Sequence, residues 1–325
     1  MKQSIGLRKG MIMMKAKNKK ITMAIGMAVG VTMLAGAAFA GYNTSNGYEV
    51  GKTAIKGLLN NENYTANTEF KMSIDGTEIA KSAMTELYDR NGDVSMNRTE
   101  ISTSDTSYID NNTEYKAYSQ DDSYISTYYS DGEAHTSIYK GDIYMGRGAF
   151  DTLNKMNDGD KETTNKVIRF VELACDTFVG DLKNNIVYVS GDDDSAAYEI
   201  SLDAIQIPEV VNAGLSAMFS SMNQYDNEDP YMVLGTDPIV KSAYLKFTVD
   251  NEGRLTNGAA NITMSGSGHE AAVDITLTMS DYGTTVPQRV DISTLPNVET
   301  YDMTADTASS RYVSEDGEVA VEIRE

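Results

Sequence analysis

Residue types that commonly carry catalysis are scarce in this sequence. It has two histidines, His135 and His269, and neither has a second histidine at the spacing that binds zinc. The segment Gly214-Leu215-Ser216 lacks the second glycine of a nucleophile elbow and does not directly follow a strand. The 48 acidic residues make carboxylate pairs inevitable, so no pair can be singled out as a catalytic acid and base. We therefore predict a protein that is not an enzyme and that uses no cofactor.

The segment Asp89–Glu100 is the best candidate for a metal site. It places an oxygen-bearing side chain at each ligand position of an EF-hand calcium loop, namely at Asp89, Asn91, Asp93, Ser95, Asn97 and Glu100. The sixth position, which requires glycine for a sharp turn, holds Val94 instead. Asn91-Gly92 between alternating residues is better explained by a type I′ hairpin turn. The acidic runs 192–194 and 226–229 indicate solvated turns, with weak extracellular calcium binding as the alternative. We therefore predict no metal site.

Tyrosines are frequent in the segment 107–144. Two interpretations are open: a stacking platform for sugar, or the half-exposed face of an antiparallel sheet, where tyrosine, serine and threonine are common. Composition favours the second interpretation. The tyrosines concerned are Tyr108, Tyr115, Tyr118, Tyr124, Tyr128, Tyr129, Tyr139 and Tyr144.

Residues 1–40 have the pattern of a secretory signal peptide. They carry seven basic residues and no acidic one, and an uncharged run from 21 to 40 ends in Ala38-Phe39-Ala40. This pattern predicts cleavage before Gly41. The alternative is an uncleaved N-terminal membrane anchor, because 20 uncharged residues can just span a bilayer. Both interpretations place the rest of the chain outside the cytoplasm, secreted or associated with the cell envelope.

Charge and cysteine content exclude two further classes. Without residues 1–40 the chain has 20 basic residues against 48 acidic ones. Such a chain repels nucleic acid and anionic lipid head groups, so we predict no nucleic-acid partner. Membrane contact is expected only through the N-terminal segment, if it is not cleaved. The single cysteine, Cys175, cannot form an internal disulfide, and its place on an apolar helix stripe predicts a buried thiol.

Hydrophobic periodicity predicts two strand-rich regions separated by helices. Alternating segments punctuated by Asp-Gly, Asn-Gly and Gly-Ser-Gly turns run from 63 to 144 and from 239 to 277. Helices are predicted over 46–60, opened by Asn46 and Glu49, and within 163–223, where a hairpin over 186–202 separates two of them. We predict an α+β fold: a long antiparallel sheet packed on a few mid-chain and N-terminal helices. One domain is predicted over 41–295, with a candidate internal boundary at 147–162, and an acidic, partly ordered tail over 296–325.

This order of elements, with a helix start at Ile207-Pro208-Glu209, resembles the exported lipoprotein carriers of the LolA/LolB-like half-barrel family. The resemblance covers roughly residues 47 to 294 and rests on element order, because no diagnostic motif is shared. In that family a curved sheet wraps around helices, and the space between them holds a lipid or acyl chain. The resemblance implies a cavity here between sheet and helices, lined by Phe178, Val210, Leu215, Met218, Phe219 and Met222.

The function expected from the sequence is therefore that of an exported, non-enzymatic envelope protein. It would bind a lipid or another apolar or amphipathic ligand between sheet and helices. The alternative is a structural or protein-interaction module of the cell envelope in which the helices simply fill the sheet. A helix stripe that faces a ligand and one that faces a core are built from the same residues, so the sequence leaves both open.

Overall fold

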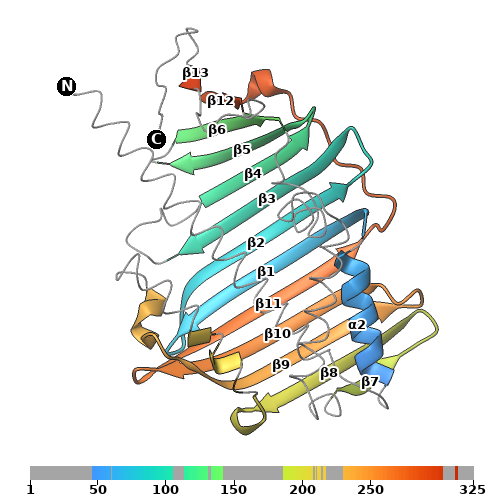
Figure 1. The fold of residues 1–325 in the computed structure, drawn as a ribbon, viewed down its shortest axis with the longest axis vertical. Coiled ribbons are helices and arrows are strands. Elements are labelled where there is room, and N and C mark those ends of the chain that lie inside the picture. Colours follow the sequence, from blue (N-terminus) through green and yellow to red (C-terminus); the bar gives the residue numbers. More distant parts are fainter. Residues whose placement is uncertain are drawn as a thin grey trace.

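The protein is described from a computed structural model. The described residues are 46–59, 61–104, 113–130, 133–141, 186–207, 209, 211–213, 215–216, 230–302 and 312–313. Figure 1 shows that these residues form one broad sheet with a helix lying across one of its faces.

Thirteen strands form this single sheet, in the order β13-β12-β6-β5-β4-β3-β2-β1-β11-β10-β9-β8-β7. The first meander comprises β1 (Asn63–Ile74), β2 (Thr77–Asp89), β3 (Val94–Ser104), β4 (Thr113–Gln120), β5 (Ser123–Ser130) and β6 (Glu133–Lys140). The second comprises β7 (Val187–Gly191), β8 (Ser195–Asp203), β9 (Ile239–Asp250), β10 (Leu255–Gly266) and β11 (His269–Ser280). Both predicted strand-rich regions and the hairpin between them are confirmed.

The two meanders join at the centre of the sheet, where β1 pairs with β11 from Thr65↔Ser280 to Ile74↔Ala271. From this seam each meander extends outward to one edge. Beyond β6, the strand β12 (Val298–Asp302) pairs in parallel with β6, and β13 (Tyr312–Val313) closes that edge. The sheet is therefore mixed, and it includes residues of the segment that we assigned to the acidic tail.

The predicted α+β class is wrong, because the described chain is mostly β. Its helices are α2 (Asn46–Leu59), the helical residues 209, 211–213 and 215–216, and the 3-10 turns η2 (Ala204–Gln206), η3 (Pro230–Leu234) and η4 (Ile292–Thr294). The physical reason is that the central strands are 11 to 13 residues long and all belong to one sheet. Their apolar side chains are buried together on one face of this sheet. The predicted helix over 46–60 is confirmed. The helix predicted from residue 163 and the candidate boundary at 147–162 lie outside the described residues.

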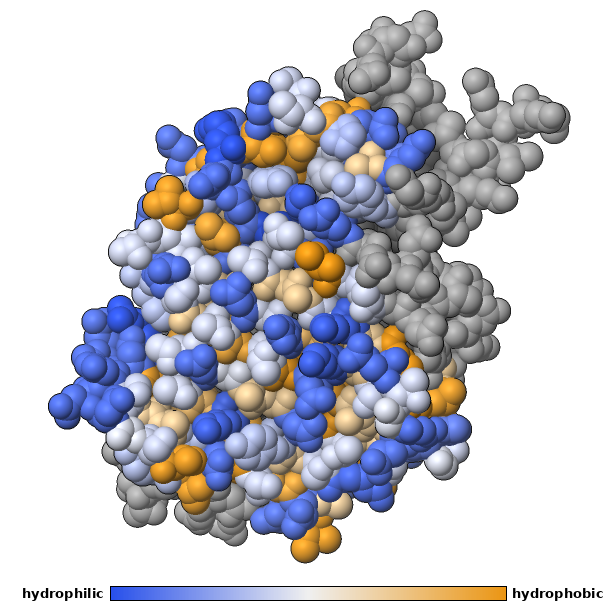
Figure 2. All heavy atoms as spheres, turned by 180° about the vertical axis from the view of Figure 1, so that it is seen from behind, coloured by the Kyte–Doolittle hydropathy of each residue, from blue (hydrophilic) through white to orange (hydrophobic). Residues whose placement is uncertain are grey.

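Alternation along the strands separates two faces of the sheet. We call the face that carries Phe70 and Met72 the inner face, because Ala54 of α2 packs in the same buried cluster. The other, the outer face, is a mosaic of polar side chains with scattered apolar ones (Figure 2). Cross-strand hydrogen bonds join its polar residues, as between Thr85 and Asn67 at 2.8 Å and between Asn261 and Asp274 at 2.8 Å.

Two hairpin turns have the backbone that their sequences require. Asp75-Gly76 and Ser267-Gly268 both have positive φ at each residue, as a type I′ turn demands. The type I′ turn predicted at Asn91-Gly92 is wrong, because neither residue has a positive φ. The loop there is longer, and the Asp89 carboxylate accepts a hydrogen bond from the Asn91 N–H at 3.2 Å, which stabilises the wider turn.

The connection from β11 to β12 runs along the rim of the sheet, past the ends of β1, β3 and β4, and contacts side chains of the outer face (Figure 1); we call it the outer strap (residues 284–297). In the described ranges the strap has no strand partner. Instead, three side-chain amides of the sheet hold the strap. Each amide makes two hydrogen bonds to the backbone of one strap residue: it donates to the C=O and accepts from the N–H. The pairs are Asn63 with Thr285, Asn97 with Gln288, and Gln120 with Val290.

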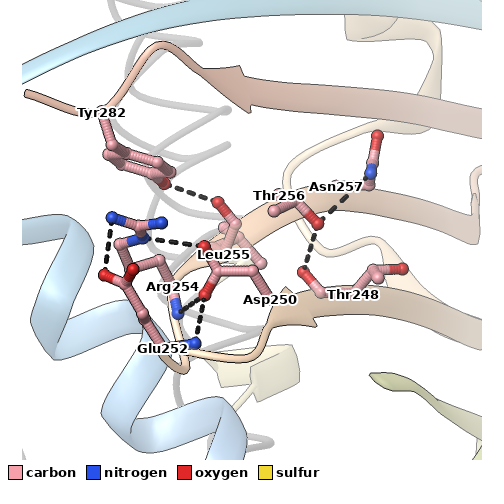
Figure 3. Close-up of polar contacts among 8 residues, drawn as sticks. All are labelled: Thr248, Asp250, Glu252, Arg254, Leu255, Thr256, Asn257 and Tyr282. Atoms are coloured by element: carbon pink, nitrogen blue, oxygen red, sulfur yellow. Dashed lines mark hydrogen bonds and ion pairs between the residues drawn. The ribbon is translucent and has the colours of Figure 1, made fainter. Parts of the chain in front are cut away.

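A polar cluster holds the start of this connection against the β9–β10 turn (Figure 3). The Asp250 carboxylate accepts the N–H groups of Glu252 and Arg254 and pairs with the Arg254 guanidinium at 2.7 Å. That guanidinium lies 5.1 Å from the centre of the Tyr282 ring, and the Tyr282 hydroxyl donates to the Leu255 carbonyl at 2.5 Å. Burial, with the nearby Asp250 carboxylate, raises the pKa of Tyr282 to about 12, so this phenol stays a donor at neutral pH.

Candidate functional site

The inner face of the sheet has two halves with different chemistry. The first, which we call the apolar half, lies on β1 and β8–β11 and is covered by α2. Its side chains are less than 10% exposed and form one hydrophobic cluster: Phe70, Met72, Ile74, Ile200, Leu202, Val240, Phe247, Val249, Ile262, Met264, Ala271 and Val273. This half is a packed core of the ordinary kind.

Of the six residues predicted to line a ligand cavity, one lies in the described part of the chain. Leu215 is partly buried and packs against the apolar half. The other five, which are Phe178, Val210, Met218, Phe219 and Met222, lie outside the described residues. The predicted cavity therefore stays a prediction, with Leu215 as its only placed member.

The second half of the inner face, on β1–β6 and β12, is lined by tyrosines. We call it the tyrosine half, and by strand register it carries Tyr64, Tyr88, Tyr115, Tyr124, Tyr128, Tyr139 and Tyr301, with Glu86, Arg98 and Glu100. Four of the tyrosines considered in the sequence belong to this set. Tyr118 and Tyr129 point to the outer face, and Tyr108 and Tyr144 lie outside the described residues.

The tyrosine half was only partly visible in the sequence. We missed three of its tyrosines because they lie outside the tyrosine-rich segment 107–144. Tyr64 and Tyr88 precede that segment, and Tyr301 follows it. The sequence did contain one signal, because successive side chains of a strand point to opposite faces. Within each strand the inner tyrosines are an even number of residues apart, whereas Tyr118 and Tyr129 are an odd number of residues from them. Pairing between strands that are distant in the sequence then brings Tyr139 and Tyr301 together, and no local sequence pattern predicts that contact.

Ring contacts link these tyrosines across the strands. The rings of Tyr64 and Tyr88 lie 5.2 Å apart, those of Tyr124 and Tyr139 lie 6.4 Å apart, and Tyr139 stacks on Tyr301 at 5.0 Å. The hydroxyls of Tyr115 and Tyr124 share a hydrogen bond of 2.5 Å. Such contacts add about 0.5–1.5 kcal/mol per ring pair beyond area burial and orient the phenols.

A largely buried ion pair lies beside these rings. The Arg98 guanidinium donates twice to the Glu86 carboxylate, through Nε at 2.8 Å and through Nη2. The Tyr64 hydroxyl donates to the other Glu86 oxygen at 2.9 Å. Burial alone would lower the pKa of Arg98, but the Glu86 carboxylate outweighs it and raises that pKa. Burial, followed by the charge of Glu86, raises the pKa of Tyr64, so its phenol remains protonated.

Besides Glu86, the tyrosine half carries the carboxylates of Glu100 and, on β12, Glu299, which accepts a hydrogen bond from the Tyr301 hydroxyl at 2.7 Å. Glu100 lies next to Tyr115 in the register of β3 and β4 and is partly buried. Burial raises the pKa of its side chain, and the charge of Arg98 only partly opposes this shift. Within the described part of the chain, Glu100 has no hydrogen-bond partner, and the one nearby arginine already pairs with Glu86. The tyrosine half therefore has an excess of negative charge.

A separate polar pocket lies at the ends of the strands, with a volume of about 560 Å³. Its lining includes Asp75, Lys241 and His269. His269 Nδ1 lies 2.7 Å from the Asp75 carboxylate, which also accepts the Glu270 N–H at 2.9 Å. That backbone bond and the contact with His269 lower the pKa of Asp75. These contacts join the β1–β2 and β10–β11 turns, so they have a structural role.

The residues considered as metal ligands are not brought together. Asp89 caps its loop, Asn97 bonds the outer strap, and Glu100 points to the inner face. Asp192 accepts the N–H groups of Asp194 and Ser195, which closes the β7–β8 turn. In the described ranges no group of three His, Cys, Asp or Glu side chains could hold a metal ion. No helix in those ranges is long and apolar enough to cross a membrane.

No protein-family model matches this chain, and a search of curated proteins finds no match. Among solved structures, LprF from Mycobacterium bovis is similar with a TM-score of 0.32 and 8% sequence identity, over 74% of this chain and 95% of LprF. Rv2717c from M. tuberculosis is similar with a TM-score of 0.21 and 7% identity, over 74% of this chain and 100% of that protein. At these TM-scores the likeness carries no argument about function. The LolA/LolB-like resemblance remains a prediction.

Proposed function

We propose that this protein is an exported binding protein of the cell envelope that takes an amphipathic ligand on the inner face of its sheet. The polar group of the ligand contacts the tyrosine half, and its apolar part contacts the helix stripe to which Leu215 belongs. The observation that carries this proposal is the change of chemistry along one continuous face, from a closed apolar cluster to oriented phenols and carboxylates.

Three properties of the tyrosine half support recognition of a polar group. Tyr115, Tyr128 and Tyr139 are only partly buried, so these residues retain some exposed surface. Tyrosine combines an apolar ring with a hydrogen-bonding tip, which suits the boundary between the head and tail of an amphipathic molecule. The carboxyl side chains of Glu86, Glu100 and Glu299 outnumber the Arg98 guanidinium on this face, which favours a cationic head group; tyrosine rings also attract cations through their negative faces.

Binding rather than catalysis is inferred from how the reactive groups are used. In the described ranges, the contact between His269 and Asp75 joins two turns, and His135 stacks on Tyr128 at 5.7 Å. An extracytoplasmic location is part of the proposal and rests on the signal pattern of residues 1–40.

Native mass spectrometry with two tail-matched probes tests this proposal. Dodecyltrimethylammonium and dodecyl sulfate have the same tail and opposite head charges, and both are added to the full chain below their micelle concentrations. We expect a discrete complex with the cationic probe, which the double substitution Tyr115→Phe and Tyr128→Phe weakens about tenfold, a loss of about 1.4 kcal/mol.

The matched control is Tyr118→Phe with Tyr129→Phe, because these residues lie on the same two strands, β4 and β5, but point to the outer face. This pair should leave the complex unchanged. Equal loss of binding in the two double variants, or a preference for dodecyl sulfate, contradicts the proposed site.

A further inference from the structure

The strand β7 ends the sheet on the side of the second meander, and among the described residues it pairs only with β8. All five of its residues are exposed. Its three consecutive large apolar side chains have high exposed fractions: 49% for Val187, 60% for Tyr188 and 43% for Val189. An open strand edge with exposed apolar side chains is a template for pairing with another chain.

Edge strands are usually protected by lysine, proline, inward-pointing charge or very short length. The residues of β7 read Val-Tyr-Val-Ser-Gly and include no charge and no proline. As far as the described residues show, one feature protects it, which is a register shift between Tyr188 and Ser190. The opposite edge differs, because β13 has two residues and pairs with a strand that carries Glu299 and Asp302. Of the two sheet edges in the described part of the chain, the β7 edge is therefore the open and uncharged one.

The charges around β7 indicate which partner the edge admits. The strand runs directly into Asp192, Asp193 and Asp194, and all three are exposed. Asp192 is used by the turn, whereas the side chains of Asp193 and Asp194 make no hydrogen bond within the described part of the chain. The chain as a whole has a net charge of −21. A second copy would therefore bring like charge to this edge, and a segment carrying lysine or arginine would bring opposite charge.

We propose that β7 is a docking strand for an extended segment of a basic protein partner, which pairs antiparallel to it and adds a fourteenth strand. Alternate apolar side chains of this segment lie on the same face as Val187, the side chains between them lie on the face of Tyr188, and main-chain hydrogen bonds supply the rest of the affinity. Antiparallel pairing places the N-terminal end of the segment beside Asp193 and Asp194, so its basic residues precede its apolar ones. This site is separate from the inner face and does not depend on a ligand there.

Fluorescence anisotropy of two labelled peptides, titrated with the full chain, tests the docking strand. The first peptide is Lys-Lys-Val-Thr-Val-Thr-Val, and the second has glutamate in place of both lysines. We expect the lysine peptide to bind at least about tenfold more tightly, with an affinity that falls as salt increases. Hydrogen exchange should show new protection of the β7 amides in its presence.

Three variants make the result decisive without disturbing the core. Val189→Lys adds charge to the exposed edge and should weaken peptide binding at least about tenfold. Val286→Lys, at a residue of the outer strap that is 75% exposed, should have no effect. Asp193→Asn with Asp194→Asn should remove the preference for lysine over glutamate.

Three results would overturn the proposal. The first is peptide binding that Val189→Lys does not change, and the second is no binding of either peptide at about 1 mM. The third is self-association of the full chain in sedimentation that Val189→Lys abolishes, because the occupant of the edge would then be a second copy of this chain.

Discussion

The apolar half and the tyrosine half share one face of one sheet, yet they are stabilised in different ways. In the apolar half, aliphatic and aromatic side chains pack together in one buried cluster. In the tyrosine half, burial is accompanied by oriented hydroxyls and by the Arg98–Glu86 pair. Buried ion pairs are weak contributors to stability compared with apolar packing. The comparison teaches that the apolar half stabilises the fold, whereas the tyrosine half holds specific polar groups in place at a cost in stability.

The largest effect is expected from truncating the apolar half. Phe70 is 7% exposed and packs in the main cluster, so Phe70→Ala should reduce the free energy of unfolding by about 3–5 kcal/mol. Urea denaturation followed by circular dichroism measures this loss. A loss below about 1 kcal/mol would mean that this half is not the main core.

Breaking the ion pair of the tyrosine half should have the next largest effect. Arg98→Met leaves the Glu86 carboxylate without its partner and should cost about 2–4 kcal/mol. Adding Glu86→Leu removes the unpaired buried carboxylate and should restore most of the lost free energy of unfolding. A double-mutant cycle by urea denaturation tests this, and a double variant as unstable as Arg98→Met would show that the pair itself supplies net stability.

A smaller and local effect is expected at the outer strap. Gln120 is 4% exposed and makes both of its amide bonds to Val290, so Gln120→Ala leaves two strap groups unpaired and should cost about 1–3 kcal/mol. The strap runs along the rim of the tyrosine half, so hydrogen exchange should accelerate in β3–β5 and not in β9–β11. Uniform acceleration of exchange would contradict a local role for the strap.

The smallest effect concerns Glu100 and depends on pH. Burial raises the pKa of this carboxyl in the folded state, so folding favours its protonated form. The stability that it contributes is present below the ordinary carboxyl pKa of about 4.3 and is lost as pH rises through the raised value. Glu100→Gln cannot ionise and should therefore be more stable than the native chain at pH 7. Thermal melts should show this gain shrinking toward pH 4, and a gain that grows on acidification would contradict the assignment.

Local features of the fold could be predicted from the sequence, whereas features that depend on distant pairing could not. Alternation and turn residues located the helix over 46–60, both meanders and the hairpin over 186–202, because these signals lie within a few residues. The β1–β11 seam joins segments about 200 residues apart, and nothing local encodes it. We therefore gave the helices too large a share of the architecture.

The same distinction applies to the candidate site. Tyr115 and Tyr128 were identified by their clustering in the sequence, but their partners Glu86 and Arg98 looked like ordinary alternating polar residues of exposed strands. Only the cross-strand register shows that both point inward beside Tyr64. The outer strap was missed for a related reason, because side-chain amides that replace a strand ladder leave no periodic pattern.

The most direct test of the two-half account is ¹⁹F NMR of the full chain labelled with 3-fluorotyrosine, recorded with and without dodecyltrimethylammonium. Resonances are assigned by single Tyr→Phe substitutions. If the tyrosine half is the binding surface, the signals of Tyr115, Tyr128 and Tyr139 shift on titration, while those of Tyr118 and Tyr129 on the outer face do not. Shifts confined to the outer-face tyrosines, or no shift in any of the five at saturating probe, would contradict the account.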